Sequence, residues 1–223
     1  LVETGLASAE LEQVGPIRIG RIVRDDKGRL GLKGIRLIQG DPKDPILDLT
    51  GNLNDVLELR DFSLEGSFRL GMAILVTGRR DATGVGALRG KLAMSDASGQ
   101  LRLEALDAKL EGTDLMSLSL HLEESDESGN RLRVKFDLSD LAQLAAAIGR
   151  QASAGIPIAF DATIAVADGT ASVSGSGRFG KTDLEGQLRF AVAEGKPKLN
   201  GSISARDLYL DDLAVAHQLP KLF

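Results

Sequence analysis

Two histidines, His121 and His217, carry the side chains of this chain best suited to general acid–base chemistry or to binding a transition metal. They stand far apart, and neither belongs to a group of Cys, Asp or Glu with the spacing of a metal site. The alternation around His121 places its side chain on the polar face of a predicted strand. Both histidines are therefore interpreted as structural.

Other motifs for chemistry are equally scarce. The chain has no cysteine, which excludes disulfides, CxxC sites and cysteine nucleophiles. The acidic run 123–127 lacks the spacing of a calcium loop and is interpreted as a solvated turn. The Gly-Ser-Gly segment 175–177 lies in a predicted strand and is interpreted as a bulge or bend. We therefore expect no enzyme and no cofactor.

The elements that would have to position any site are predicted to be β-strands. Apolar and polar residues alternate in about 13 short runs, and the connecting turns contain Asp, Ser and Gly. The runs are 17–23, 30–38, 46–51, 62–70, 73–78, 88–94, 101–110, 115–122, 132–138, 158–166, 171–179, 184–192 and 198–205. Because the connections are short, the predicted fold is all-β, an antiparallel meander.

Helix is predicted at few places. Segment 140–148 has a helical pattern, with Ser139 or Asp140 as its cap and Gly149 at its end. Segments 54–59 and 211–216 are predicted to form a helical turn each. The fold is therefore expected to contain one or two short helices.

A repeat organises the chain. The turn glycines Gly28, Gly99 and Gly169 recur about every 70 residues, each before an alternating run. We predict an N-terminal lead-in at 1–16, a repeating β-segment at 17–213 in three units (17–86, 87–156 and 157–213), and a tail or linker at 214–223.

The alternation makes the predicted sheet apolar on one face only. Aromatic residues are 4% of the chain, which favours a long, shallow apolar surface over one dense core. About 13 strands would make a sheet about 60 Å long, which normally curls or splits. We therefore predict a curved sheet forming an elongated apolar groove, bent at Gly66 and Gly186.

Residues that share the apolar face of their runs are predicted to line this groove. They are Leu64, Phe68, Leu92, Leu103, Leu120, Val134, Phe136, Ile164, Leu188 and Phe190.

Charge and hydropathy exclude two classes of protein. The formal net charge is −5 without a basic block, so nucleic acid is not an expected partner. The sequence contains no stretch of 18 apolar residues, the length needed to span a bilayer. Its first residues lack the pattern of a signal peptide. The chain is expected to be an excised segment.

Three segments together resemble the AsmA family. Residues 183–190 (DLEGQLRF) look like its "sdlxGxl" strand, residues 195–205 (GKPKLNGSISA) like its "kPxlxGxlxs" strand, and residues 207–213 (DLYLDDL) like its "LxLdDL" close. Residues 49–57, 92–103 and 114–118 also look like inner repeats of the family, so the resemblance covers most of 17–213.

The resemblance implies a function. AsmA-like proteins, with TamB and YhdP, are bridge-like lipid transfer proteins of the Gram-negative envelope, usually anchored in the inner membrane, whose β-groove carries acyl chains between membranes. By this resemblance the chain is a periplasmic segment, its anchor lies outside it, and its partners are phospholipids, neighbouring repeats or envelope proteins. The alternative left open is a structural or adhesive β-repeat domain with a closed, dry core.

Overall fold

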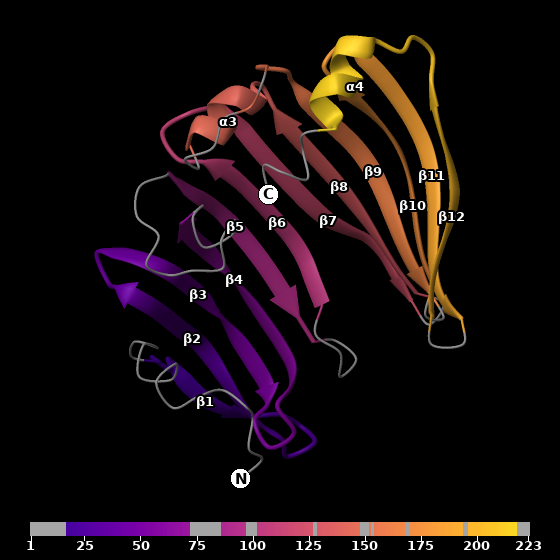
Figure 1. Cartoon of the computed structure of the whole chain (residues 1–223). Coiled ribbons are helices and arrows are strands. Elements are labelled where there is room, and N and C mark those ends of the chain that lie inside the picture. Colours follow the sequence, from indigo (N-terminus) through magenta and orange to yellow (C-terminus); the bar gives the residue numbers. More distant parts are fainter. Residues whose placement is uncertain are drawn as a thin grey trace. The chain divides into compact units, whose positions relative to one another are not determined.

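The computed structural model describes residues 17–71, 86–96, 102–126, 129–147, 152, 154–167, 170–193 and 196–217. Within these ranges the protein is all-β, and the strand order in the sheet follows the chain from β1 to β12 (Figure 1). The strands are β1 (Arg21–Arg24), β2 (Leu30–Asp41), β3 (Asp44–Asp55), β4 (Arg60–Gly71), β5 (Ala87–Ser95), β6 (Arg102–Leu110), β7 (Met116–Asp126), β8 (Gly129–Leu138), β9 (Ile158–Ala167), β10 (Thr170–Phe179), β11 (Thr182–Ala193) and β12 (Lys196–Ala205). Helix α3 (Leu141–Ala147) follows β8, and α4 (Leu210–Ala216) follows β12.

The chain forms two compact units. The N-terminal unit contains β1 to β4 and residues Arg89–Ala105, and the C-terminal unit contains β7 to β12 with both helices. Twelve of the predicted strand runs correspond to described strands, and the run 73–78 lies outside the described residues. The predicted all-β meander is therefore confirmed; the three repeat units stay a prediction.

Local side-chain hydrogen bonds form the first turn of the N-terminal unit. The carboxylate of Asp25 accepts hydrogen bonds from the backbone N–H groups of Lys27 and Arg29, at 2.9 and 2.8 Å. Gly28 has a φ of +81°, a conformation that glycine adopts without steric cost. Asp and Gly at these positions therefore form the turn that the sequence predicted.

Gly66 lies where the backbones of β3 and β4 approach closely, and its predicted bend stays a prediction. It lies opposite Leu49 in β3, and a Cβ atom on Gly66 would overlap the backbone carbonyl oxygen of Asp48. The register between β3 and β4 is regular at this point. Glycine is required here because the two backbones approach too closely for any side chain.

Of the two roles predicted for segment 175–177, bulge or bend, the bulge was wrong and the bend stays a prediction. Residues Thr170 to Phe179 pair with β9 and with β11 in unbroken register. A Cβ atom on Gly175 would overlap the backbone carbonyl oxygen of Asp161, so this glycine also permits close approach of a neighbouring strand. In the described strands, register shifts lie between Lys33 and Ile35, between Gln39 and Gly40, and between Leu122 and Glu124.

The acidic run 123–127 was also interpreted incorrectly. Strand β7 continues to Asp126, so most of the run is strand and not turn. The backbone of Glu124 lies opposite Arg131 in β8, and the carboxylate of Glu123 lies 3.8 Å from the guanidinium of Arg133. An opposite-charge pair between neighbouring strands, such as Glu123 with Arg133, stabilises their pairing.

Helix α3 begins at the predicted cap. The carboxylate of Asp140 accepts a hydrogen bond from the backbone N–H of Gln143 at 3.0 Å, so Asp140 and not Ser139 caps the helix. This hydrogen bond lowers the pKa of Asp140, outweighing the burial that raises it. The side chains of Leu141, Leu144 and Ala145, which belong to this helix, are buried. The predicted end at Gly149 lies outside the described residues.

Candidate functional site

The apolar face of the C-terminal unit is the candidate site, and strand register defines it. Residues directly opposite in neighbouring antiparallel strands project to the same side of a sheet. Leu122, Leu132, Ile164, Val173 and Leu188 form one such row across β7 to β11. The adjacent rows are Leu120, Val134, Ala162, Gly175, Gly186 and Ile203, then Leu118, Phe136, Phe160, Gly177 and Leu184, and on the other side Val166, Ala171, Phe190 and Leu199.

Six of the ten predicted groove residues lie on this apolar face. They are Leu120, Val134, Phe136, Ile164, Leu188 and Phe190. These side chains share one face because apolar residues alternate with polar ones along each strand. The register then places the apolar residues of neighbouring strands opposite one another. That these side chains line a lipid groove stays a prediction.

The other four predicted residues lie outside these rows. Leu64 and Phe68 face the same side of β4, opposite Gly51 and Leu47 in β3. Leu92 in β5 and Leu103 in β6 are half-buried, and Lys91, which precedes Leu92, is exposed. Within its own unit, the Leu64–Phe68 pair forms a second apolar surface.

Exposure differs greatly along the apolar face of the C-terminal unit. Leu138 and Val134 in β8 are 1% and 9% exposed. Leu199 and Ile203 in β12 are 66% and 65% exposed, and Phe190 in β11 is 44% exposed. Contiguous exposed apolar side chains are uncommon on soluble proteins and mark surfaces that bind something.

Helix α3 lies at one end of the buried part. The backbone N–H of Ser139 donates to the carbonyl of Leu115, and that of Leu141 donates to the carbonyl of Ile156, at 2.9 and 3.0 Å. These hydrogen bonds attach the helix next to the ends of β7 and β9, where Leu115 and Leu138 are buried. The apolar face from β10 to β12 is left with large exposed side chains.

Sequence reasoning missed several members of the apolar face. Phe160 stacks on Phe136 with ring centroids 5.2 Å apart, and Phe160 itself is 41% exposed. Leu199 and Ile203 are the most exposed large side chains of the face. The signal that could have found all three is the same alternation, continued into β9 and β12.

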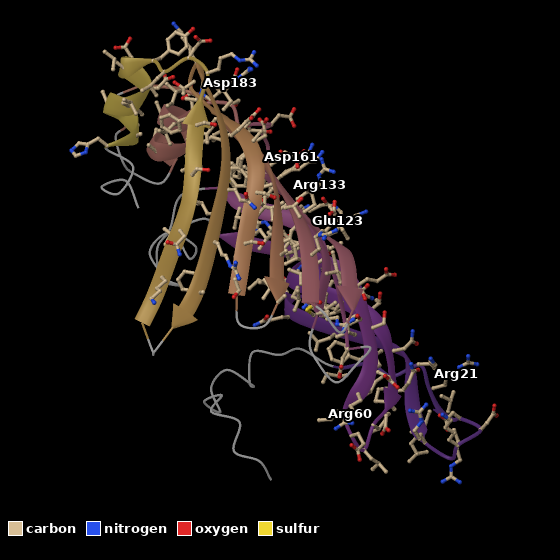
Figure 2. The ribbon with its side chains drawn as sticks, turned by 90° about the vertical axis from the view of Figure 1, so that its right-hand side faces the viewer. Arg21, Arg60, Glu123, Arg133, Asp161 and Asp183 are labelled. Atoms are coloured by element: carbon tan, nitrogen blue, oxygen red, sulfur yellow. The ribbon has the colours of Figure 1, made fainter. Side chains whose placement is uncertain are left out.

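The opposite face carries ion pairs. The guanidinium of Arg133 in β8 donates two hydrogen bonds of 2.9 Å to the carboxylate of Asp161 in β9, and Lys135 lies 3.4 Å from the same carboxylate. Hydrogen bonding from Arg133 lowers the pKa of Asp161, and hydrogen bonding to Asp161 raises the pKa of Arg133. Figure 2 shows Glu123, Arg133 and Asp161 projecting from the same side of the ribbon.

The two histidines lie in separate elements, His121 in β7 and His217 at the end of α4. His121 is exposed on the polar face, with its Nε2 3.2 Å from the carboxylate of Asp107. His217 is the C-cap of α4, where its backbone N–H donates to the carbonyl of Leu213. In the part of the chain that the structure describes, no cluster of three His, Cys, Asp or Glu could hold a metal ion. None of the helices among these residues is long and apolar enough to cross a membrane.

Comparison of the chain with models of protein families, with curated proteins and with solved structures found no match. The apolar face and the sequence motifs are therefore the two features that point to a function.

Proposed function

We propose that this chain binds acyl chains of phospholipids on the apolar face of its sheet, as a segment of an AsmA-like bridge for lipid transfer. The observation that carries the proposal is the exposed apolar surface of β9 to β12, with Phe160, Phe190, Leu199 and Ile203 at least 41% exposed. Transfer of an acyl chain from water to such a surface is favourable by about 0.8 kcal/mol per buried CH₂.

The lining supports sliding rather than a single tight site. Apart from the phenylalanines, the rows consist of Leu, Ile, Val, Ala and Gly, which offer neither charge nor hydrogen bonds to hold a ligand at one position. The headgroup would stay in water at the open side, while the acyl chain moves along the apolar rows. In this role the protein performs no catalysis.

The proposed setting follows from the resemblance. The motifs at 183–213 are those that resemble the AsmA family, and they lie in β11, β12 and α4, next to the most exposed part of the apolar face. We therefore place the chain in the periplasm of a Gram-negative envelope, joined to the inner membrane through parts outside this chain. Neighbouring repeats or envelope proteins are its proposed partners.

Photocrosslinking to a phospholipid with a diazirine-bearing acyl chain tests this function. Leu188→Asp and Phe136→Asp place a carboxylate in the apolar rows, which costs several kcal/mol unless the group is protonated or hydrated. Both variants should lose most of the crosslinked lipid. Leu199→Asp is a variant that should fold as the wild type does, because this side chain is two-thirds exposed in the wild type.

Gln187→Asp is the matched control. Gln187 precedes Leu188 in β11, so its side chain projects to the opposite face. This variant should crosslink as the wild type does. Equal crosslinking of wild type and Leu199→Asp, or no phospholipid in native mass spectrometry of the wild type, would contradict the proposal and favour a structural β-repeat.

A further inference from the structure

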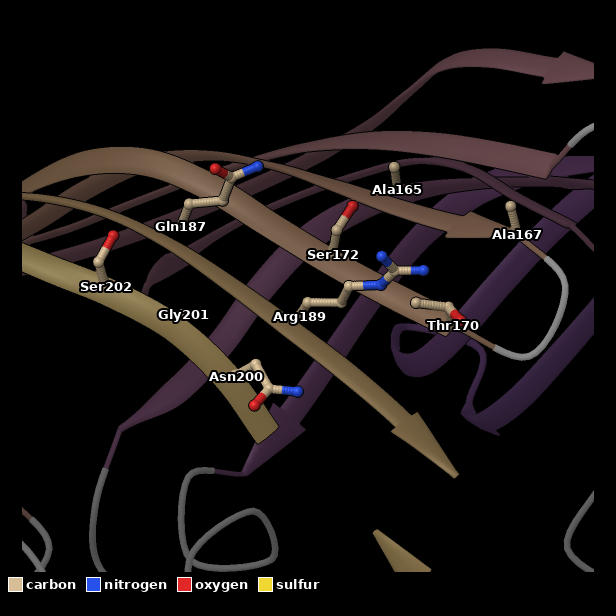
Figure 3. Close-up of a pocket in the computed structure, with 9 residues that line it drawn as sticks. All are labelled: Ala165, Ala167, Thr170, Ser172, Gln187, Arg189, Asn200, Gly201 and Ser202. Atoms are coloured by element: carbon tan, nitrogen blue, oxygen red, sulfur yellow. The ribbon is translucent and has the colours of Figure 1, made fainter. Parts of the chain in front are cut away.

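A depression lies on the polar face of β9 to β12, on the side of the sheet opposite the apolar rows. Its volume is about 570 Å³. The side chains of Thr170, Ser172, Gln187, Arg189, Asn200 and Ser202 contribute its polar groups (Figure 3).

Small side chains leave this space open. Ala165, Ser172, Arg189 and Asn200 lie directly opposite one another in β9, β10, β11 and β12. The side chains of Ala165 and Ser172 are short and leave space above β9 and β10. The longer side chains of Arg189 and Gln187 in β11 border this space. Figure 3 shows Arg189, Ser172 and Gln187 rising from the same side of the ribbon.

Arg189 differs from the other arginines of this face in its surroundings. Arg178 pairs with Asp183 at 2.8 Å, and Arg133 pairs with Asp161 at 2.9 Å. Among the described residues, no carboxylate lies within ion-pair distance of Arg189, whose direct cross-strand partners are Ser172 and Asn200. The depression therefore has a positive charge and neutral hydrogen-bonding groups around it.

A second cation lies close to this charge. Lys198 in β12 is opposite Ala191, and it is two residues from Asn200 on the same face. Diagonal neighbours in a sheet are about 7–8 Å apart at the backbone, so Lys198 adds a second positive charge to this part of the polar face.

We propose that this depression binds a hydroxylated ligand that carries one oxyanion, of the size and chemistry of a sugar phosphate. A guanidinium fork matches the geometry of phosphate oxygens with two parallel hydrogen bonds. The amides of Asn200 and Gln187 and the hydroxyl of Ser172 can both donate to and accept from sugar hydroxyls. The volume of this open depression, about 570 Å³, is large enough to hold such a ligand.

This site is independent of the proposed acyl-chain surface. Leu188 and Arg189 are consecutive in β11, so their side chains project to opposite faces of one sheet. A lipid lying against Leu188 lies on the face of the sheet opposite to the side chain of Arg189. The ligand therefore approaches the polar face, either free in solution or as the headgroup of a separate lipid.

Nuclear magnetic resonance titration of the folded chain with glucose 6-phosphate tests the proposal. The Arg189 Nε–H and the Asn200 and Gln187 side-chain amide signals should shift in a saturable manner. Arg189→Gln should raise the dissociation constant about tenfold or more, since hydrogen bonds to charged groups are the strong ones. Arg178→Gln is the matched control, because Arg178 is on the same face and is paired with Asp183; it should bind as the wild type does.

Further probes identify the source of the phosphate and the part played by the hydroxyl groups. Vesicles of phosphatidylcholine with phosphatidylinositol, against phosphatidylcholine alone, present the same chemistry as a headgroup. Binding of either probe that depends on Arg189 supports the site. Inorganic phosphate binding as tightly as glucose 6-phosphate would overturn the sugar component, and an affinity unchanged by Arg189→Gln, or no binding of any probe, would overturn the site. Loss of acyl-chain crosslinking in Leu199→Asp leaves these results unaffected, so the two proposals fail separately.

Discussion

Phe136 and Phe160 face each other across β8 and β9, with their rings stacked at a centroid distance of 5.2 Å and an interplanar angle of 22°. This pair stands where the apolar face changes from buried to exposed, because Val134 and Leu138 beside Phe136 are buried and Phe160 is 41% exposed. A stacked aromatic pair adds about 0.5–1.5 kcal/mol beyond the area that it buries.

Replacement of Phe136 should therefore destabilise the fold. Phe136→Ala removes the stacked ring and half-buried apolar area, and we expect a loss of about 2–3 kcal/mol in the free energy of unfolding. Phe190→Ala, on the same face but 44% exposed, should cost less than about 1 kcal/mol. Urea unfolding followed by circular dichroism measures both. Equal losses would contradict the difference in packing along this face.

The close approach of β3 and β4 makes a second prediction, about Gly66. Gly66→Ala forces the two strands apart at the Asp48 carbonyl, and we expect a loss of about 2–3 kcal/mol. Gly71→Ala is the matched control at the end of the same strand, because no atom of the described residues lies within 4 Å of a Cβ atom there. Chemical unfolding of both variants distinguishes close packing from general loss of glycine flexibility, which would affect the two positions alike.

Much of the fold could be predicted from the sequence, because alternation is a local signal. Leu132, Val134 and Phe136 share one parity, and the structure places all three on the same face. The cap of α3 was equally local, because Asp140 contacts a residue only three positions away. Such features need no knowledge of distant parts of the chain.

The features that escaped prediction depend on contacts between distant segments. The close approach at Gly66 was not predicted, because the group it meets across the sheet, the carbonyl of Asp48, is distant in sequence. Arg189 resembles any other charged residue of a polar face. That its cross-strand neighbours among the described residues are the neutral Asn200 and Ser172 becomes visible only in the strand register. Register, and not alternation, decides these roles.

Helix α4 provides a third prediction, which concerns pH. The Oδ2 atom of Asp212 accepts hydrogen bonds from the backbone N–H groups of Lys181 and Thr182, both at 2.9 Å, and from the Thr182 hydroxyl at 2.7 Å. Burial raises the pKa of Asp212, but these hydrogen bonds outweigh it and hold the pKa below its ordinary value. The carboxylate thus fastens α4 to the turn between β10 and β11.

A lowered pKa in the folded state gives the sign of the effect. The stabilisation is fully present above the unfolded-state pKa of about 4 and is lost as the pH falls through the lower folded-state pKa. Hydrogen exchange at the Lys181 and Thr182 amides, corrected for intrinsic rates, should be constant from neutral pH to about pH 5 and should accelerate below about pH 4. Asp212→Asn should lose protection already at neutral pH, while Asp211→Asn, at an exposed position, should behave as the wild type does. If amide exchange at Lys181 and Thr182 in the wild type does not accelerate below about pH 4, the Asp212 carboxylate does not hold α4 to this turn.

The outer edge of β12 provides the last prediction. Residues 198–205 are exposed, and in the described sheet β12 has a strand neighbour on one side only, β11. Open edges with apolar side chains pair with other strands. Antiparallel pairing of two copies about Gly201 would place Leu199 of each copy opposite Ile203 of the other, which keeps apolar side chains on one face.

We therefore expect a dimer that forms as the protein concentration rises, measured by light scattering across a dilution series. Ile203→Lys should keep the chain monomeric, because it removes the apolar contact twice in a symmetric pair and adds a charge at the edge. Ile22→Lys, at a 69% exposed position in β1, should dimerise as the wild type does. If Ile22→Lys abolishes the dimer as well, the copies join β12 to β1 and the symmetric arrangement is wrong. A wild type that stays monomeric at every concentration would show that the β12 edge does not pair on its own.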